Sequence, residues 1–218
     1  PGPRYTSYPP VPFWDAAFGE AAYRAALARV AADADATLSL YVHLPFCAER
    51  CAYCGCNATV TKHAYVVDAY LDQVEAELAL VGPQLGGRRK VVQLHWGGGT
   101  PNFLNAAQTR RLFSLLDAAF VIDRQGEISI EMDPRIGTRE QLELYRELGF
   151  NRLSFGVQDI NAEVQVAIGR IQPFTQTSGL YDAARALGFG SINLDLVYGL
   201  PYQTPAAFAD TLSAILAL

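Results

Sequence analysis

Four cysteines within ten consecutive residues are the side chains best suited to chemistry in this sequence. They are Cys47, Cys51, Cys54 and Cys56, in the spacing C-x3-C-x2-C-x-C. A disulfide framework would spread its cysteines between distant loops, so the clustering indicates metal binding in a reducing compartment. We therefore predict a cytoplasmic protein. Thiolates are soft ligands that suit either an iron–sulfur cluster or zinc.

The number of cysteines that bind the metal decides the chemistry. Structural zinc on all four thiolates is one reading, although closed zinc sites usually take two ligand pairs from separate knuckles. If instead Cys47, Cys51 and Cys54 hold a [4Fe–4S] cluster, one iron has no protein ligand and can chelate the amino and carboxylate groups of S-adenosylmethionine. One electron then breaks the S–C5′ bond and gives methionine and a 5′-deoxyadenosyl radical, while the protein supplies the open site and the orientation.

A glycine-rich turn, Gly97-Gly98-Gly99-Thr100-Pro101, follows a predicted strand at residues 91–96. Consecutive glycines let a ligand approach the backbone N–H and C=O groups, although such a segment can also be only a tight loop. Its place one strand after the cysteines is similar to the motif that holds the amino group of S-adenosylmethionine. The cysteine spacing after a first strand resembles the signature of radical S-adenosylmethionine (radical SAM) enzymes, with Tyr53 in the aromatic position before Cys54.

These motifs need a scaffold, and the sequence predicts one of alternating strands and helices. Segments of mixed apolar residues, suited to strands buried under helices, occur at residues 38–43, 91–96, 127–132, 152–157 and 191–197. Helices between them have readable ends, with N-caps at Asn105, Thr138 and Thr204 and stops at Gly82-Pro83, Gly149 and Gly188. This alternation implies right-handed βαβ units and a parallel sheet.

The first 37 residues differ from the rest. Residues 1–14 are rich in proline and aromatic residues and predict an extended arm, and residues 20–32 are alanine-rich and predict a helix. We expect the arm to pack on the domain surface. The alternative is that the arm covers a bound ligand. Arg4 can pair with a carboxylate or stay solvated.

Bulk composition limits the classes of function. The chain has 218 residues, 50% of them hydrophobic, which suits a single domain with one substantial core. A net charge of −5 gives no general electrostatic case for nucleic acid or an anionic membrane. No apolar run approaches the roughly 18–20 residues of a membrane helix. The chain begins at Pro1 and stops within an apolar helical pattern, so we expect it to be the front part of a longer protein.

Motifs spread from the first residues to the last share the pattern of one family. They are residues 1–9 (PGPRYTSYP), 41–47 (YVHLPFC), 54–57 (CGCN), 95–101 (HWGGGTP), 131–134 (EMDP), 156–159 (GVQD) and 195–201 (DLVYGLP). Together they resemble the oxygen-independent coproporphyrinogen III oxidases, which are radical SAM enzymes. Related haem chaperones share the cysteine run and the glycine turn but typically lack this arm.

The resemblance implies a fold, a reaction and partners. The fold is α/β, a partial TIM-like (β/α) barrel with parallel strands at residues 38–218, incomplete at its C-terminal end and preceded by the arm and helix at residues 1–37. The reaction is oxidative decarboxylation of coproporphyrinogen III to protoporphyrinogen IX in haem biosynthesis. The adenosyl radical removes a β-hydrogen from a propionate, and loss of CO2 and one electron leaves a vinyl group, twice. The family binds two S-adenosylmethionine molecules, and we expect a monomer that takes electrons from a flavodoxin or ferredoxin.

The resemblance also implies roles for particular residues. Cys47, Cys51 and Cys54 are the cluster ligands. The first S-adenosylmethionine contacts Tyr41, Gly98 and Glu131, and the second contacts Tyr53, Gly99, Thr100, Gln158, Arg170 and Asp195. Several of these side chains lie at the C-terminal ends of predicted strands, where α/β folds place ligands, although each could also make only a strand-end hydrogen bond. The roles of Cys56, the family's extra cysteine, and of His43 stay open.

Three other functions compete with this one. A haem chaperone keeps the cluster motif but only carries haem. A radical SAM methyltransferase acting on a tetrapyrrole can also use two cofactor molecules, and its product gains a CH2 where decarboxylation loses CO2. A structural zinc module contains neither iron nor sulfide.

Overall fold

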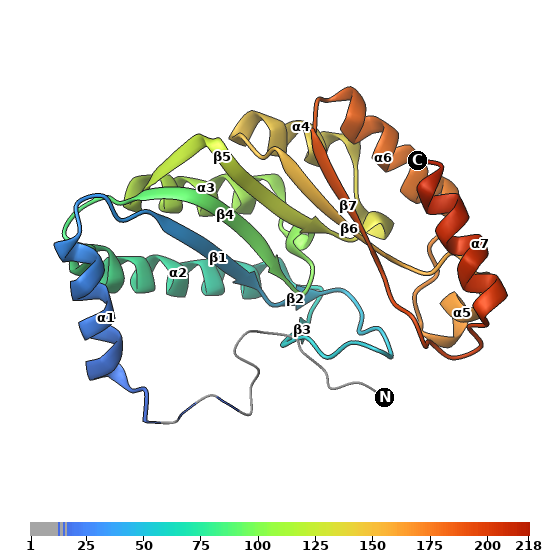
Figure 1. Ribbon diagram of the computed structural model, residues 1–218, viewed down its shortest axis with the longest axis horizontal. Helices are drawn as coiled ribbons and strands as arrows, with labels where there is room; N and C mark the ends of the chain where they lie inside the picture. The colour runs from blue at the N-terminus through green and yellow to red at the C-terminus, as the bar shows by residue number, and fades with distance from the viewer. Residues whose placement is uncertain (1–12, 14, 16) are drawn as a thin grey trace.

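Strands and helices alternate along the part of the chain that the computed structural model describes, residues 13, 15 and 17–218 (Figure 1). The strands are β1 (Leu38–Leu44), β2 (Phe46–Cys47), β3 (Thr59–Val60), β4 (Lys90–Gly98), β5 (Val121–Met132), β6 (Arg152–Gln158) and β7 (Ser191–Leu196). The helices are α1 (Glu20–Ala32), α2 (Ala64–Val81), α3 (Ala106–Ala119), α4 (Arg139–Leu148), α5 (Ala162–Ala167), α6 (Phe174–Ala186) and α7 (Pro205–Leu216). Short 3₁₀ turns, η2 (Gly82–Leu85), η3 (Pro101–Phe103) and η4 (Pro134–Ile136), lie between them.

The main sheet has five parallel strands in the order β1-β4-β5-β6-β7. Neighbours in the sheet follow one another along the chain once the small β2–β3 pair is set aside, and each pair is separated by one α-helix, or by two between β6 and β7. This is the βαβ pattern that the sequence predicts, so the α/β class with parallel strands is confirmed. All five carboxyl ends consequently point to the same edge of the sheet.

The two faces of the sheet have opposite chemistry. On one face a row of register partners is apolar and largely buried, from Trp96 on β4 through Ile130 on β5 to Leu153 on β6. On the other face the neighbouring row is polar, and it crosses all five strands through Tyr41, His95, Ser129, Arg152 and Ser191. Period-two alternation of the side chains therefore separates a packing face from a face that can meet a polar ligand.

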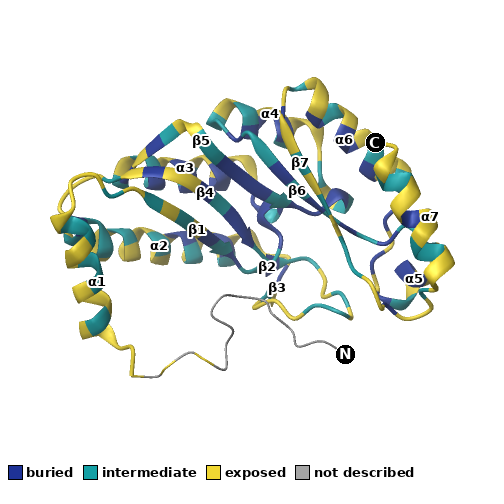
Figure 2. Ribbon diagram, in the orientation of Figure 1, coloured by how far each residue is buried: buried dark blue, intermediate teal, exposed yellow. Residues whose placement is uncertain are grey.

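Helices α2, α3, α4 and α6 cover the apolar face (Figure 1). The centre of the sheet is accordingly the most buried part of the molecule (Figure 2). Trp96 packs edge-on against Phe150 at 5.0 Å between ring centroids, and Phe113 lies 5.8 Å from Phe150. Burying such aromatic side chains removes large apolar areas from water, which holds the helical layer on the sheet.

The predicted helix ends are confirmed. Asn105 and Gln108 form a reciprocal capping box at α3, and Thr138 and Gln141 form another at α4. Gly149, with φ 98°, ends α4 in the left-handed conformation that glycine adopts without steric penalty. These local interactions satisfy orphan backbone groups of each helix and fix where each returning strand starts.

Three parts of the fold differ from the expectation. Gly97 and Gly98 belong to β4 and do not follow it, because β4 stays paired with β1 as far as Gly98. Strand β5 begins at Val121 instead of Glu127, since Val121 and Ile122 pair with Lys90 and Val91 before a register shift. The strands β2 and β3 and the six-residue α5 were not predicted, because each is too short to show a periodic pattern.

In the N-terminal part, the structure describes Phe13, Asp15, the turn at residues 17–19 and helix α1. Helix α1 has the predicted bounds, and Arg89 ties its end to the sheet by donating to the carbonyls of Ala31 and Asp33. The predicted arm, with Arg4, otherwise lies outside the described residues. Within the range that the structure covers, no helix combines the length and the apolar character needed to cross a membrane.

Candidate active site

The cysteines lie on a loop whose two ends are joined. We call residues 47–58, between β2 and β3, the cysteine loop. Strands β2 and β3 pair in parallel, and Thr61 N donates to Cys47 O at 3.0 Å. In the middle of the loop, Cys54 N donates to Cys51 O, and Ala52 N donates to Ile168 O at the end of α5. The backbone thus gathers the cysteines at the carboxyl edge of the sheet.

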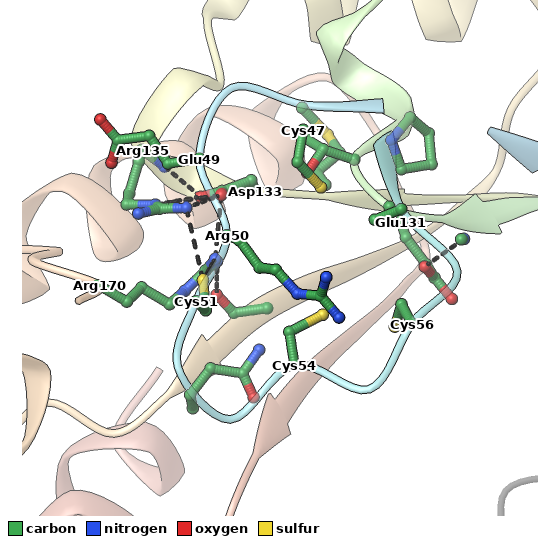
Figure 3. A pocket seen from close by; sticks show the side chains of 18 of the residues that line it. Cys47, Glu49, Arg50, Cys51, Cys54, Cys56, Glu131, Asp133, Arg135 and Arg170 are labelled. Carbon is green, nitrogen blue, oxygen red and sulfur yellow. Dashed lines mark hydrogen bonds and ion pairs between the residues drawn. The ribbon is translucent and has the colours of Figure 1, made fainter. Parts of the chain in front are cut away.

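One pocket at this edge brings together the predicted ligands (Figure 3). It encloses about 790 Å³ of space, part of it open to solvent, between the cysteine loop and the ends of β4, β5, β6 and β7. Its lining contains all three predicted cluster cysteines and all but one of the predicted S-adenosylmethionine contacts: Cys47, Cys51, Cys54, Tyr53, Gly98, Gly99, Thr100, Glu131, Gln158, Arg170 and Asp195.

The thiols are soft donors, which suit an iron–sulfur cluster as well as zinc. Among the residues that the structure describes, no three His, Cys, Asp or Glu side chains stand close enough to share a single metal ion. A structural zinc ion takes four tetrahedral ligands, usually as two pairs from separate knuckles, whereas an iron–sulfur cluster takes its cysteines at separate corners. Cys56 lies on the Glu131 side of the pocket, opposite Cys51 (Figure 3). Cys47, Cys51 and Cys54 all line the pocket beside the glycine turn, and these soft donors fit a cluster bound by three thiolates.

The surroundings of Cys47 and Cys56 disfavour the thiolate forms of these two side chains. Burial raises the pKa of the Cys47 thiol, and the hydrogen-bonding contact with Thr100 Oγ1 at 3.3 Å lowers it in part. Burial, with the nearby Cys54, raises the pKa of Cys56 to about 11. Because a thiol must lose its proton to bind metal, cluster assembly here releases protons.

The glycine turn and Glu131 are locked together at the end of β4. Gly98 N donates to Glu131 Oε2 at 3.1 Å, and φ of 119° at Gly98 is a conformation that side chains rarely adopt. His95 Nε2 lies 3.2 Å from the other Glu131 oxygen, and its Nδ1 lies 2.7 Å from Ser129 Oγ. The Glu131 carboxylate is therefore fixed where it faces the pocket.

Tyr41 is the one predicted contact that does not line this pocket. It is exposed on β1, its ring stacks on His95, and its hydroxyl lies 3.1 Å from His43 Nδ1. The ring is shielded from water in part, and this partial burial together with the Glu131 charge raises the pKa of Tyr41 to about 12. His43 also bonds the carbonyl of Asn57 through Nε2 at 2.9 Å, so its ring is a hydrogen-bonded link between β1 and the cysteine loop.

The ends of β6 and β7 supply the other side of the pocket. Gln158 has φ of 71°, which is uncommon for a residue other than glycine, and its carbonyl accepts from Val197 N. A Cβ at Gly156 would lie only 2.9 Å from Gln158 Nε2, so glycine there leaves room for the amide. Asp195 accepts hydrogen bonds from Ser154 Oγ and Asn193 Nδ2.

Tyr53 belongs to a separate small apolar cluster beside the cysteine loop. It is partly buried and packs with Val164, Ile168 and Leu200. Burial raises the pKa of Tyr53, and the charge of Arg170 opposes that change. The aromatic residue thus connects the cysteine loop to α5, and it also lines the pocket.

An ion-pair cluster beside Cys51 was missed by the sequence analysis. Buried Asp133 binds Arg135 at 2.7 Å and Arg170 at 3.0 Å. Burial alone would raise the pKa of Asp133, but the hydrogen bond from Arg135 and the charge of Arg170 hold this pKa below its usual range. Arg170 also donates to Gly156 O, and its Nε has no partner among the described residues.

Asp133 could have been found by the rule that placed Glu131 at a strand end, since it directly follows β5. Arg135 could not, because nothing in the sequence indicates that its side chain turns back toward the cysteine loop. Exposed Arg50 also lines the pocket and was likewise not predicted.

Comparison with known proteins agrees with the geometry. A family model described as the Radical SAM superfamily matches residues 41–215. The oxygen-independent coproporphyrinogen III oxidase of Escherichia coli (strain K12) is 49% identical over 214 residues, which cover 98% of this chain and 46% of that protein. The protein of the same name from Synechocystis sp. is 45% identical over 210 residues, covering 96% of this chain and 45% of that one.

A solved structure gives the same result for the fold. Coproporphyrinogen III oxidase from Escherichia coli, described as a radical SAM enzyme, superposes with a TM-score of 0.90 at 48% identity, covering 98% of this chain and 48% of that one. The partial (β/α) barrel predicted from the sequence is thereby confirmed. The chain spans about half the length of the curated relatives it matches.

Proposed function

The chain belongs to the radical SAM superfamily, and we propose that Cys47, Cys51 and Cys54 hold its [4Fe–4S] cluster. The superfamily uses this cluster with S-adenosylmethionine, and both are the cofactors of this chain. One observation carries the assignment of ligands, namely that these three thiols share a pocket with the glycine turn and with polar side chains from the ends of β5, β6 and β7. Bound there, the cofactors supply radical chemistry by one-electron cleavage of S-adenosylmethionine.

The pocket residues divide into two groups of proposed contacts. Tyr41, Gly98 and Glu131 would meet a first S-adenosylmethionine. The fixed Glu131 carboxylate can accept from an ammonium group, which is the charge match that an amino acid moiety needs. Tyr41 does not line the pocket, and its ring stacks on His95, which contacts Glu131. The proposed contact of Tyr41 with the first S-adenosylmethionine would therefore be made beside the pocket.

A second S-adenosylmethionine would lie against the other wall. Its proposed contacts are Tyr53, Gly99, Thr100, Gln158, Arg170 and Asp195, which all line the pocket. Arg170 offers a buried guanidinium, whose planar donors suit a carboxylate, and Asp195 offers an exposed carboxylate. The left-handed backbone at Gln158 places a strained residue at this wall, and such strain is typical of binding sites.

We propose that the whole protein is an oxygen-independent coproporphyrinogen III oxidase. The relatives that carry this name match almost the entire chain, although the chain covers less than half of each. The reaction would convert two propionates to vinyl groups, each losing one hydrogen atom, CO2 and one electron. The polar face of the sheet, from Tyr41 to Ser191, adjoins the pocket and would face the substrate.

The remaining assignments complete the proposal. Residues 38–218 would form the radical SAM part, with residues 1–37 as an arm and helix before it. A flavodoxin or ferredoxin would deliver the electron, and the enzyme would act as a monomer.

The test uses the full-length protein, purified and reconstituted without oxygen. We expect about four irons and four sulfides per chain, and an EPR signal of the reduced cluster that changes when S-adenosylmethionine is added. With reductant and S-adenosylmethionine, coproporphyrinogen III should lose two CO2. Zinc without iron or sulfide would exclude the cluster, haem binding without turnover would indicate a chaperone, and a product heavier by CH2 would indicate a methyltransferase.

A further inference from the structure

Cys51 stands beside two arginines that share one carboxylate. The Arg170 Nη1 atom lies 3.7 Å from Cys51 Sγ, and the Arg135 Nη2 atom lies 3.9 Å from the same sulfur. Both guanidinium groups bind Asp133, whose side chain is 8% exposed. This thiol therefore has two guanidinium groups and the carboxylate that they share as charged neighbours (Figure 3).

Arg135 is held in this position from several directions. Its Nε and Nη2 both bind the Asp133 carboxylate, at 3.0 and 2.7 Å. Its backbone N–H donates to Asp133 Oδ1, and its carbonyl accepts from Gln176 Nε2 at 3.0 Å. The two-point contact fixes the plane of the guanidinium, because a planar fork matches a carboxylate in few orientations. The side chain is 20% exposed, so solvent screens its charge only in part.

The two arginines are not equivalent in the proposed function. Arg170 is a proposed contact of S-adenosylmethionine, and its second nitrogen is occupied by Gly156 O. Arg135 has no assigned contact with cofactor or substrate, and it lines the pocket beside Cys51. The reduction potential of an iron–sulfur cluster depends on nearby charge and on hydrogen bonds to its sulfurs. Arg135 would change both of these factors, because it places a fixed positive charge near the cluster and directs an N–H at the sulfur of Cys51.

We propose that Arg135, oriented by Asp133, is a positioning residue that raises the reduction potential of the cluster through Cys51. The inference rests on the proposed cluster at Cys47, Cys51 and Cys54. Reduction adds one negative charge to the cluster, and the Arg135 charge stabilises that reduced form. Loss of the charge leaves the oxidised form favoured, so the midpoint potential becomes more negative.

The experiment is a redox titration of the reconstituted full-length protein, followed by EPR, without substrate and without S-adenosylmethionine. In Arg135→Gln, the ratio of reduced to oxidised cluster at a fixed solution potential should fall about tenfold, which is about 59 mV for one electron. Arg135→Lys keeps the charge and should recover at least half of this shift. Arg139→Gln is the matched control, because it removes the same charge from an exposed ion pair with Glu143 on α4, and it should leave the potential unchanged.

The outcomes separate this inference from the proposed function. Equal potentials in wild type and Arg135→Gln, both with full iron and sulfide content, would overturn the inference and leave the proposed function standing. A lysine variant displaced as far as the glutamine variant, or an equal shift in Arg139→Gln, would also overturn it. A wild-type protein that holds no iron and sulfide would overturn the proposed function and this inference together.

Discussion

Gly99 is the position where one added methyl group should separate the glycine turn from the cysteine loop. A Cβ there would lie 2.9 Å from Phe46 O, 3.0 Å from Phe46 N and 3.0 Å from Pro45 C. All three are backbone atoms, so no rotamer change can relieve the contact. The segment that carries Cys47 would have to move away from β4, although Gly99 N donates to Leu44 O at 2.9 Å and resists that movement.

The expected cost follows from the overlap. Overpacking of this kind typically destabilises by about 1–3 kcal/mol. For a chain of this size each kcal/mol lowers the melting temperature by roughly 2–4 °C, so Gly99→Ala should melt about 2–12 °C below wild type. Iron content after anaerobic reconstitution should also fall, because Cys47 is displaced from the other two thiols.

The assay pairs calorimetry of the apo protein with an iron determination, and Gly179→Ala is the control. A Cβ at Gly179, within α6, meets nothing within 4 Å. Alanine there should stabilise the helix by about 0.5–1 kcal/mol. The reasoning is refuted if Gly99→Ala keeps both its melting temperature and its iron, or if Gly179→Ala loses stability to the same extent.

Three further predictions concern charge, ligation and capping. Asp133→Asn should destabilise the apo protein by about 3 kcal/mol at neutral pH, because buried Arg170 loses its charged partner. The pKa of Asp133 is lower in the folded than in the unfolded protein, so the extra stability of wild type over Asp133→Asn is complete above the ordinary pKa near 3.9 and shrinks as the pH falls below it. Urea titrations at pH 7 and below pH 4 measure this difference in the free energy of unfolding. The same difference at both pH values would contradict the prediction. Cys51→Ser should lose most of its iron while Cys56→Ser retains it, and equal losses would show that the cysteines are not divided as proposed. Thr138→Ala removes the cap of α4 and should cost about 1 kcal/mol in chemical denaturation with iron content unchanged, whereas an unchanged denaturation midpoint would mean that the cap is dispensable.

Much of the scaffold could be predicted because its signals are local. Capping residues such as Thr138 and the apolar strand segments act on the backbone within a few residues, and the sheet order follows from the handedness of βα connections. The early part of β5 could not be predicted, since Asp123-Arg124-Gln125-Gly126 is polar and joins the strand through long-range pairing. The glycines of β4 were placed after the strand because glycine usually interrupts one.

The candidate site was predictable only in part for a similar reason. Spacing identified the cysteines, and the family resemblance identified the other predicted lining residues, several of which also lie at strand ends. Neither indicates side-chain direction, so the contacts of Arg135 with Asp133 and Cys51 were not foreseen. Tyr41 was predicted to contact the first S-adenosylmethionine, and the stacking of its ring on His95 was not foreseen.

The short β2–β3 pair has a consequence for how the metal site assembles. It joins the ends of the stretch of eleven residues, 48–58, that carries Cys51 and Cys54. Closing a flexible loop of that length costs about 2 kcal/mol of chain entropy. Here the pairing of β2 with β3 closes the loop when the protein folds. Cofactor insertion therefore does not have to supply the free energy of loop closure. The apo protein should accordingly keep its fold when iron is removed, unlike small zinc domains whose folding depends on their metal.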